Sequence, residues 1–131
     1  MQAGSAYAIG MTHHSKEELI RRCFAAYKTA DRSEIERLLA DDFTFTSPYD
    51  DHIDRAEYFA RCWPMAGSFE YHDLKLTLGH GDAYLVLYEG KSRKGAMFRN
   101  VELFHFAGDR VRSIEVFFGL PPGAVPATPP R

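Results

Sequence analysis

The feature that most constrains the fold is a change in hydrophobic period near residue 70. Before that point apolar residues recur at helical spacing, and after it they alternate with polar residues as they do in strands. Helices first and a run of long strands last predict the α+β class. We therefore expect a strongly curved antiparallel sheet wrapped around one long N-terminal helix, with two short helices beside it.

Each predicted helix begins with a capping box, in which a side-chain oxygen accepts a backbone N–H three residues further on. The three boxes are Ser15 with Glu18, Ser33 with Glu36, and Asp54 with Glu57. Pro64 is expected to end the third helix, because the residue before a proline is driven out of the helical conformation.

Alternating patterns bounded by Gly-rich or Asp-rich turns predict five strands. They are 43–47, 74–78, 83–89, 96–106 and 111–118. Residues 1–14 are small, polar and aperiodic and are expected to be flexible, and 120–131 is a proline-rich tail that we also expect to be flexible. The folded domain is therefore predicted at 15–119.

Composition excludes several classes of partner. The net charge is −2, with 16 basic and 18 acidic residues interspersed, so we expect neither nucleic acid nor an anionic membrane to bind. Cys23 and Cys62 fall in apolar helical patterns and are expected to be reduced, which, with no export signal visible, predicts a cytoplasmic location. Aromatic residues make up 14% of the chain, a share that suits the lining of an apolar cavity.

Three stretches carry a family resemblance: AAYKTADRSEIERLLADDFTF near the start, MFRNVELFHF in the third long strand, and IEVFFG at the end. Their order resembles the nuclear transport factor 2-like superfamily, and within it the SnoaL-like (polyketide cyclase-like) domains. The hallmark is a strand entered through Asp41-Asp42-Phe43 after a helix, a polar turn and a small helix. The resemblance implies that the sheet is cone-shaped, a cystatin-like roll around one small-molecule pocket. It does not specify an activity, because the superfamily includes isomerases, dehydratases, cyclases, epoxide hydrolases and binding modules.

Comparison with two enzyme families of this superfamily reduces the number of reactions that the chain is expected to catalyse. Where a ketosteroid isomerase has an oxyanion-binding tyrosine this chain has Cys23, and where it has an aspartate base this chain has Ser47. Only its third position, a carboxylic acid kept neutral in an apolar site, is matched, by Glu102. Limonene-type epoxide hydrolases need an Arg and an Asp on one strand face, whereas Arg99 and Glu102 fall on opposite faces unless a bulge intervenes. SnoaL-like cyclases require little more than one pocket carboxylate, which the chain can supply.

Glu102 is the principal candidate for a catalytic residue. Period-two geometry places Phe98, Asn100, Glu102 and Phe104 on one strand face, and the resemblance implies that this face lines the pocket. Burial among aromatic rings would raise the pKa of the carboxyl toward neutrality, where it can deliver or accept a proton. Asn100 can orient a ligand carbonyl beside it. The alternative is a structural glutamate satisfied by Asn100 or Tyr27.

Other candidates surround this face. Tyr27, Ser47 and Tyr58 are expected to supply hydroxyl groups to the pocket, and each is otherwise a packing residue. Cys23 lies on the same helical stripe. Apolar walls are expected from Phe24, Phe43, Phe45, Trp63, Val116 and Phe118. Such walls favour a small apolar, aromatic or carbonyl ligand, and the alternative is a filled core without a cavity.

The stretch YDDHID at 49–54 gathers three carboxylates and an imidazole, groups that bind divalent metals. Asp54 is already used as a helix cap, and neighbours on a loop cannot converge on one ion without ligands from elsewhere. We therefore expect no metal and no cofactor. His52 stays a candidate proton shuttle at the pocket mouth.

Two further histidines, His72 and His105, invite comparison with the pocket histidines of scytalone-type dehydratases. His105 alternates onto the face opposite the pocket, together with Val101 and Leu103. That face, which also includes Phe117, is apolar for a sheet that faces solvent. We therefore expect a homodimer through the outer sheet face.

Two functions are compatible with these features. In the first, the chain is a cofactor-independent lyase, isomerase or cyclase, and Glu102 moves a proton on a ligand positioned by Asn100 and a hydroxyl of Tyr27 or Ser47. In the second, it is a non-catalytic small-molecule-binding or protein-interaction module with the same pocket. The second function explains the two missing isomerase residues equally well.

Overall fold

The computed structural model describes residues 15–125, and its first element is the helix α2 (Lys16–Thr29). The Ser15 hydroxyl accepts the N–H of Glu18 at 3.0 Å, which confirms the predicted cap. The helix ends at Ala30, whose φ of 57° is left-handed and whose N–H bonds back to the last turn. The predicted flexible segment 1–14 and the end of the predicted tail, 126–131, lie outside the described residues.

Of the two caps predicted for the short helices, one is wrong and one is confirmed. The predicted Ser33–Glu36 cap is wrong: Asp31 caps α3 (Arg32–Leu38) by accepting the N–H of Glu34, and the Ser33 hydroxyl donates to Asp31. The reason is the tight turn after α2, which begins the next helix two residues earlier. Asp54 caps α4 (Arg55–Arg61) as predicted. Pro64 lies in the 3-10 turn η1 (Trp63–Met65) just beyond α4.

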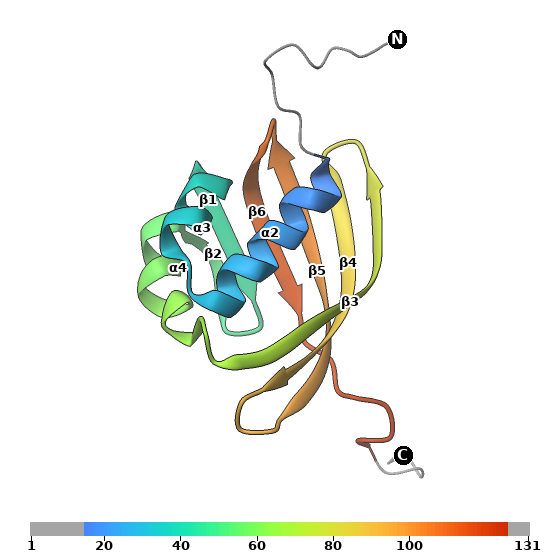
Figure 1. Ribbon diagram of the computed structural model, residues 1–131. Helices are drawn as coiled ribbons and strands as arrows, with labels where there is room; N and C mark the ends of the chain where they lie inside the picture. Colours follow the sequence, from blue (N-terminus) through green and yellow to red (C-terminus); the bar gives the residue numbers. More distant parts are fainter. Residues whose placement is uncertain (1–14, 126–131) are drawn as a thin grey trace.

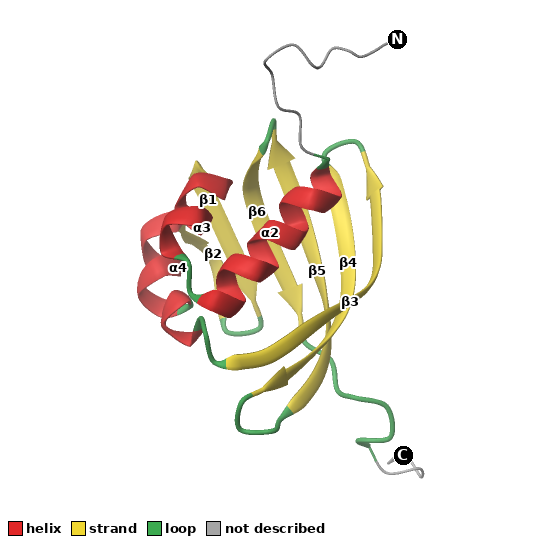
Figure 2. Cartoon of the chain, in the orientation of Figure 1, coloured by secondary structure: helices red, strands yellow, loops and turns green. Residues whose placement is uncertain are grey.

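Six strands form one curved sheet behind α2 (Figures 1 and 2). They are β1 (Leu39–Ser47), β2 (Asp50–Asp54), β3 (Phe69–His80), β4 (Ala83–Ser92), β5 (Met97–Ala107) and β6 (Arg110–Phe117). The order is β2-β1-β6-β5-β4-β3, and every pair is antiparallel except β1 with β6, which is parallel. Within the described residues, the expected α+β class with a curved sheet and three helices is confirmed.

The observed strand boundaries differ most from the predicted ones where apolar and polar residues do not alternate regularly. β2 was expected to be a loop, because its polar sequence buries only one apolar side chain, Ile53. Its pairing with β1 comes from the backbone and so leaves little trace in the sequence. β3 begins at Phe69, five residues before its predicted start, since shifts in its register interrupt the period of two.

The helix α2 lies diagonally across the concave side of the sheet (Figure 1) and buries one stripe against it. That stripe consists of Leu19, Ile20, Cys23 and Ala26. Fully burying one large aliphatic side chain contributes roughly 1.5–3 kcal/mol, so this stripe fixes α2 to the sheet. Among residues 15–125, none of the helices has the length and apolarity needed to cross a membrane.

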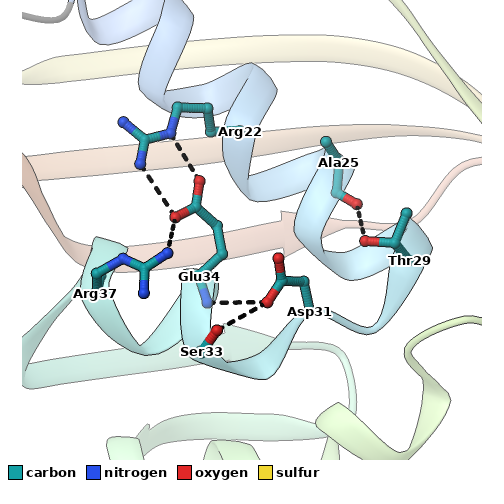
Figure 3. Close-up of polar contacts among 7 residues, drawn as sticks. All are labelled: Arg22, Ala25, Thr29, Asp31, Ser33, Glu34 and Arg37. Carbon is teal, nitrogen blue, oxygen red and sulfur yellow. Dashed lines mark hydrogen bonds and ion pairs between the residues drawn. The ribbon is translucent and has the colours of Figure 1, made fainter.

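An ion-pair cluster joins α2 to α3 (Figure 3). Arg22 donates two hydrogen bonds to the carboxylate of Glu34, at 2.8 and 3.1 Å, and Arg37 donates a third at 2.9 Å. These bonds lower the pKa of Glu34, with the Arg22 bond as the largest cause. Only 18% of the Glu34 side chain is exposed, so solvent screens the pair less than it would on an open surface.

We predict that Glu34→Gln lowers the free energy of unfolding by about 1 kcal/mol at pH 7. Because the folded-state pKa of Glu34 is depressed, the stabilisation is present above its unfolded pKa and disappears as the pH falls through the folded value. Urea denaturation of both proteins at pH 7 and at pH 3 measures the difference. Glu36→Gln is the matched control, because it breaks only the exposed Arg32–Glu36 pair. An equal loss in both variants would contradict a special role for Glu34.

Candidate functional site

A cavity of about 790 Å³ lies between α2, α4 and the concave face of the sheet. Its wall includes nearly all the sequence-predicted site residues, namely Cys23, Phe24, Tyr27, Phe45, Ser47, Tyr58, Phe98, Asn100, Glu102, Phe104, Val116 and Phe118. Three predicted residues, Trp63, His52 and Phe43, are not in this wall. Trp63 packs against Tyr27 and Phe59, and His52 is exposed and bonded to Asp51. Phe43, expected as a wall, is a fully buried core residue.

Sequence reasoning missed several polar members of the wall. They are Tyr88, Asp50, Arg61, Cys62 and Tyr49, whereas His72, a candidate from the sequence, also lies in the wall. The sequence could have indicated Tyr88, because Tyr84, Val86 and Tyr88 are two residues apart and so lie on one strand face. Its position beside Asn100 could be found only with the register of β4 against β5.

Glu102 is at one end of a chain of hydrogen bonds that begins at Gly119. The Tyr88 hydroxyl donates to Glu102 Oε2 at 2.5 Å, and the Asn100 amide nitrogen donates to the Tyr88 hydroxyl at 3.1 Å. The Asn100 carbonyl oxygen accepts the backbone N–H of Gly119 at 3.1 Å. A side chain at position 119 would collide with the Arg99 carbonyl, so the close approach requires glycine. The acid is thus connected through two side chains to the end of β6.

Desolvation raises the pKa of Glu102 to about 7, and the Tyr88 hydrogen bond lowers it by a smaller amount. The same burial, together with the adjacent carboxylate, raises the pKa of Tyr88, so its phenol stays protonated. Glu102 is therefore near half-protonation at neutral pH, a condition that suits a general acid or base. Cys23 is buried close by with a raised thiol pKa and stays uncharged.

The predicted hydroxyl donors are present but partly engaged. The Tyr27 hydroxyl donates to the carbonyl of Cys62 at 3.3 Å, and the Ser47 hydroxyl oxygen accepts the N–H of Tyr49 at 3.1 Å. Tyr58 is buried, with its ring against Phe45. Ser47 still has its own proton to donate, and the Tyr58 hydroxyl makes no hydrogen bond with any residue of 15–125, which leaves Tyr58 the least committed of the three hydroxyls.

His72 is surrounded by aromatic rings in the cavity wall. Its ring centroid lies 5.0 Å from Phe69, 5.6 Å from Phe24 and 5.8 Å from Tyr88. Burial lowers its pKa to about 4, so the imidazole is neutral at pH 7. His105, in contrast, lies on the outer face, 3.3 Å from the hydroxyl of Ser113.

Two further sequence expectations can be compared with the geometry. The β4–β5 register runs without a bulge from Met97 to His105, so Arg99 and Glu102 lie on opposite faces of β5. The carboxylates of 49–54 diverge: Asp50 pairs with Arg61, Asp51 with His52, and Asp54 caps α4. Within residues 15–125, no three His, Cys, Asp or Glu side chains are grouped to bind a metal.

Several solved structures have the same fold as this chain. An NTF2-like protein of unknown function from Cytophaga hutchinsonii is 18% identical, with a TM-score of 0.67 over 82% of this chain and 92% of that one. An LEH-like epoxide hydrolase from M. tuberculosis is 15% identical, with a TM-score of 0.64 over 76% and 79%. A hypothetical protein with a ketosteroid isomerase-like fold from Catenulispora acidiphila, in complex with trimethylamine, is 16% identical, with a TM-score of 0.63 over 86% and 100%.

These likenesses define the class of protein by its fold, which is NTF2-like. Comparison with curated protein sequences gives no significant match. The SnoaL-like domain family matches residues 20–114, and the chain belongs to that family. The resemblance expected from the sequence is therefore confirmed.

We predict that Glu102→Gln makes the protein more stable at alkaline pH. The folded-state pKa of Glu102 is raised, so wild-type stability falls as the pH rises from the unfolded value toward about 7. The glutamine variant has no such loss and should exceed wild type by up to about 3 kcal/mol at pH 8, while the difference shrinks toward pH 4.5. Urea denaturation at the two pH values measures it. A difference that does not change with pH would contradict a desolvated Glu102.

Proposed function

We propose that the chain is a cofactor-independent enzyme of the lyase, isomerase or cyclase type that acts on a small aromatic or carbonyl compound. One observation carries the proposal: Glu102 lines a cavity of apolar walls, and burial there raises its pKa to about 7. In its carboxylate form Glu102 can remove a proton from the carbon beside a carbonyl group, and the neutral acid that results can return a proton to that carbon.

Each neighbour of Glu102 has a separate role in this proposal. Tyr88 donates to Glu102 Oε2, so the proton that Glu102 exchanges is carried by its other oxygen. Asn100, bonded at both ends of its amide, is a positioning residue for Tyr88 rather than a direct partner of the ligand. Ser47, Tyr58 and Tyr27 are the hydroxyls available for ligand contact, and Tyr27 can only accept there because it donates its proton to Cys62. The rings of Phe24, Phe45 and Phe98 bind the apolar body of the ligand.

A non-catalytic binding module is the second candidate. The observation that favours it is the completeness of the chain from Gly119 to Glu102, which satisfies the acid without a ligand. In such a module, Glu102 would only donate a hydrogen bond to the ligand. The two candidates differ in whether Glu102 exchanges a proton with the bound molecule.

We predict that the protein accelerates exchange of the methyl protons of 2-acetylnaphthalene with D₂O, measured by proton NMR. Glu102→Gln should reduce that acceleration about 100-fold or more, since general acid–base catalysis contributes 10²–10⁴-fold. Its affinity for the ketone should stay within about threefold of wild type, because the amide can still donate a hydrogen bond. Binding without any exchange by the wild-type protein would support the binding module instead.

We also propose a homodimer through the outer face of the sheet. The register places two apolar rows there, Leu76-Leu87-Val101-Phe117 and Leu78-Leu85-Leu103. Leu78, Leu85 and Phe117 are about half exposed in the single chain. Contiguous apolar surface of this kind is unusual on a monomer and typical of an interface.

We also propose a cytoplasmic location for the protein, because both of its cysteines are free.

Sedimentation velocity at micromolar concentration should give twice the mass of one chain. Leu85→Arg, which places a charge at the centre of the apolar rows, should give a monomer with unchanged circular dichroism. Lys94→Asp in the β4–β5 turn is the control for a change of charge elsewhere on the surface. A wild-type monomer at this concentration would overturn the proposed dimer.

A further inference from the structure

A second carboxyl group, Asp50, lies in the same cavity wall as Glu102. Asp50 pairs with Ser47 across β2 and β1, and Glu102 pairs with Val116 across β5 and β6. Because Thr46 pairs with Glu115 in the parallel register, Ser47 is level with Val116. Asp50 and Glu102 therefore end one row that crosses four strands, roughly 14 Å along the sheet at about 4.8 Å per strand.

Asp50 has acceptor capacity that the protein does not use. Its side chain is only 8% exposed, and Oδ1 lies 2.6 Å from an Arg61 nitrogen. Oδ1 is therefore neutralised by Arg61 and is buried against it, so it is not the oxygen that a ligand can reach. Oδ2 accepts only the weak thiol donor of Cys62, at 3.8 Å. Buried carboxylate oxygens normally accept stronger donors than a thiol, so Oδ2 in the cavity wall can accept a further hydrogen bond from a ligand or water.

We propose that Asp50 is a hydrogen-bond-accepting subsite for a hydroxyl group at the end of the ligand remote from Glu102. This inference rests on the proposed function, because it takes the carbonyl end of the ligand to lie at Glu102. Arg61 is adjacent and disfavours an ammonium group there, so the donor is a neutral hydroxyl. The ligand class becomes a hydroxylated carbonyl compound with an aromatic or alicyclic body between its two polar ends.

The alternative role for Asp50 is structural, as an ion pair that fastens β2 to the end of α4. The two roles of Asp50 differ in whether they require Arg61. An ion pair needs both Asp50 and Arg61, whereas an accepting subsite needs the carboxylate alone.

The experiment compares the binding of 2-acetylnaphthalenes that bear a hydroxymethyl or a methoxymethyl group at position 6. Both keep the ketone and the rings, but only the first can donate a hydrogen bond. At pH 7 the wild-type protein should bind the alcohol about tenfold more tightly than the ether, as expected for a hydrogen bond to a charged acceptor. Isothermal titration calorimetry measures both affinities.

Three variants separate the two roles. Asp50→Ala should remove the preference for the alcohol while the affinity for the ether stays within about threefold. Asp50→Asn, which keeps one oxygen, should retain part of the preference and serves if the alanine variant does not fold. Arg61→Gln breaks the same ion pair but keeps the carboxylate, and it should keep the preference.

The outcomes also separate this inference from the proposed function. Equal affinity for alcohol and ether in the wild type, or a preference that survives in Asp50→Ala, would overturn the subsite while leaving the Glu102 site standing. A preference lost equally in Arg61→Gln and Asp50→Ala would assign Asp50 to the ion pair and overturn it too. If unsubstituted 2-acetylnaphthalene itself fails to bind, the proposed ligand class fails, and the subsite fails with it.

Discussion

The hydrogen bond from Tyr88 to Glu102 is the interaction on which the site depends. A carboxyl group surrounded by apolar walls is costly to bury unless a partner satisfies it. Tyr88 supplies that partner from the neighbouring strand, and Asn100 and Gly119 extend the chain to the end of β6. The acid is therefore held by strand register rather than by a mobile loop, which gives it a fixed position against any bound molecule.

The direction of every bond in this chain follows from its last member. The backbone N–H of Gly119 can only donate, so the Asn100 oxygen must accept and its nitrogen must face Tyr88. The Tyr88 oxygen then accepts from Asn100, and its proton is directed to Glu102 Oε2. One carboxyl oxygen is thereby fixed as an acceptor, and the proton of neutral Glu102 belongs on the other. The backbone N–H of Gly119 thus determines, through Asn100 and Tyr88, which carboxyl oxygen of Glu102 carries the proton.

The sequence alone could predict the three helices and every strand except β2, including β5, the strand that carries Glu102. Period-two alternation placed Asn100 and Glu102 together on β5, and helical spacing gave the α2 stripe with Cys23 and Phe24, all of which line the cavity. Tyr88 and Asp50 were missed, because only register shows which residues of neighbouring strands are level. Trp63 was assigned to the cavity by its chemistry, but the turn η1 directs it against Tyr27 and Phe59. Periodicity predicts which face a side chain is on, whereas pairing decides what it meets.

The fold separates the residues that cost stability from those that supply it. A glutamate with a raised pKa reduces stability above neutral pH, and the Oδ2 atom of Asp50, which accepts only a weak thiol donor, adds a further cost. The compensating interactions lie elsewhere: core residues such as Leu39 and Val111 are fully buried, and the Arg22–Glu34 pair joins α2 to α3. Because these contacts do not include the polar side chains of the cavity, those side chains can change without unfolding the domain. That separation gives a physical reason why one fold can carry isomerases, hydrolases and binding modules.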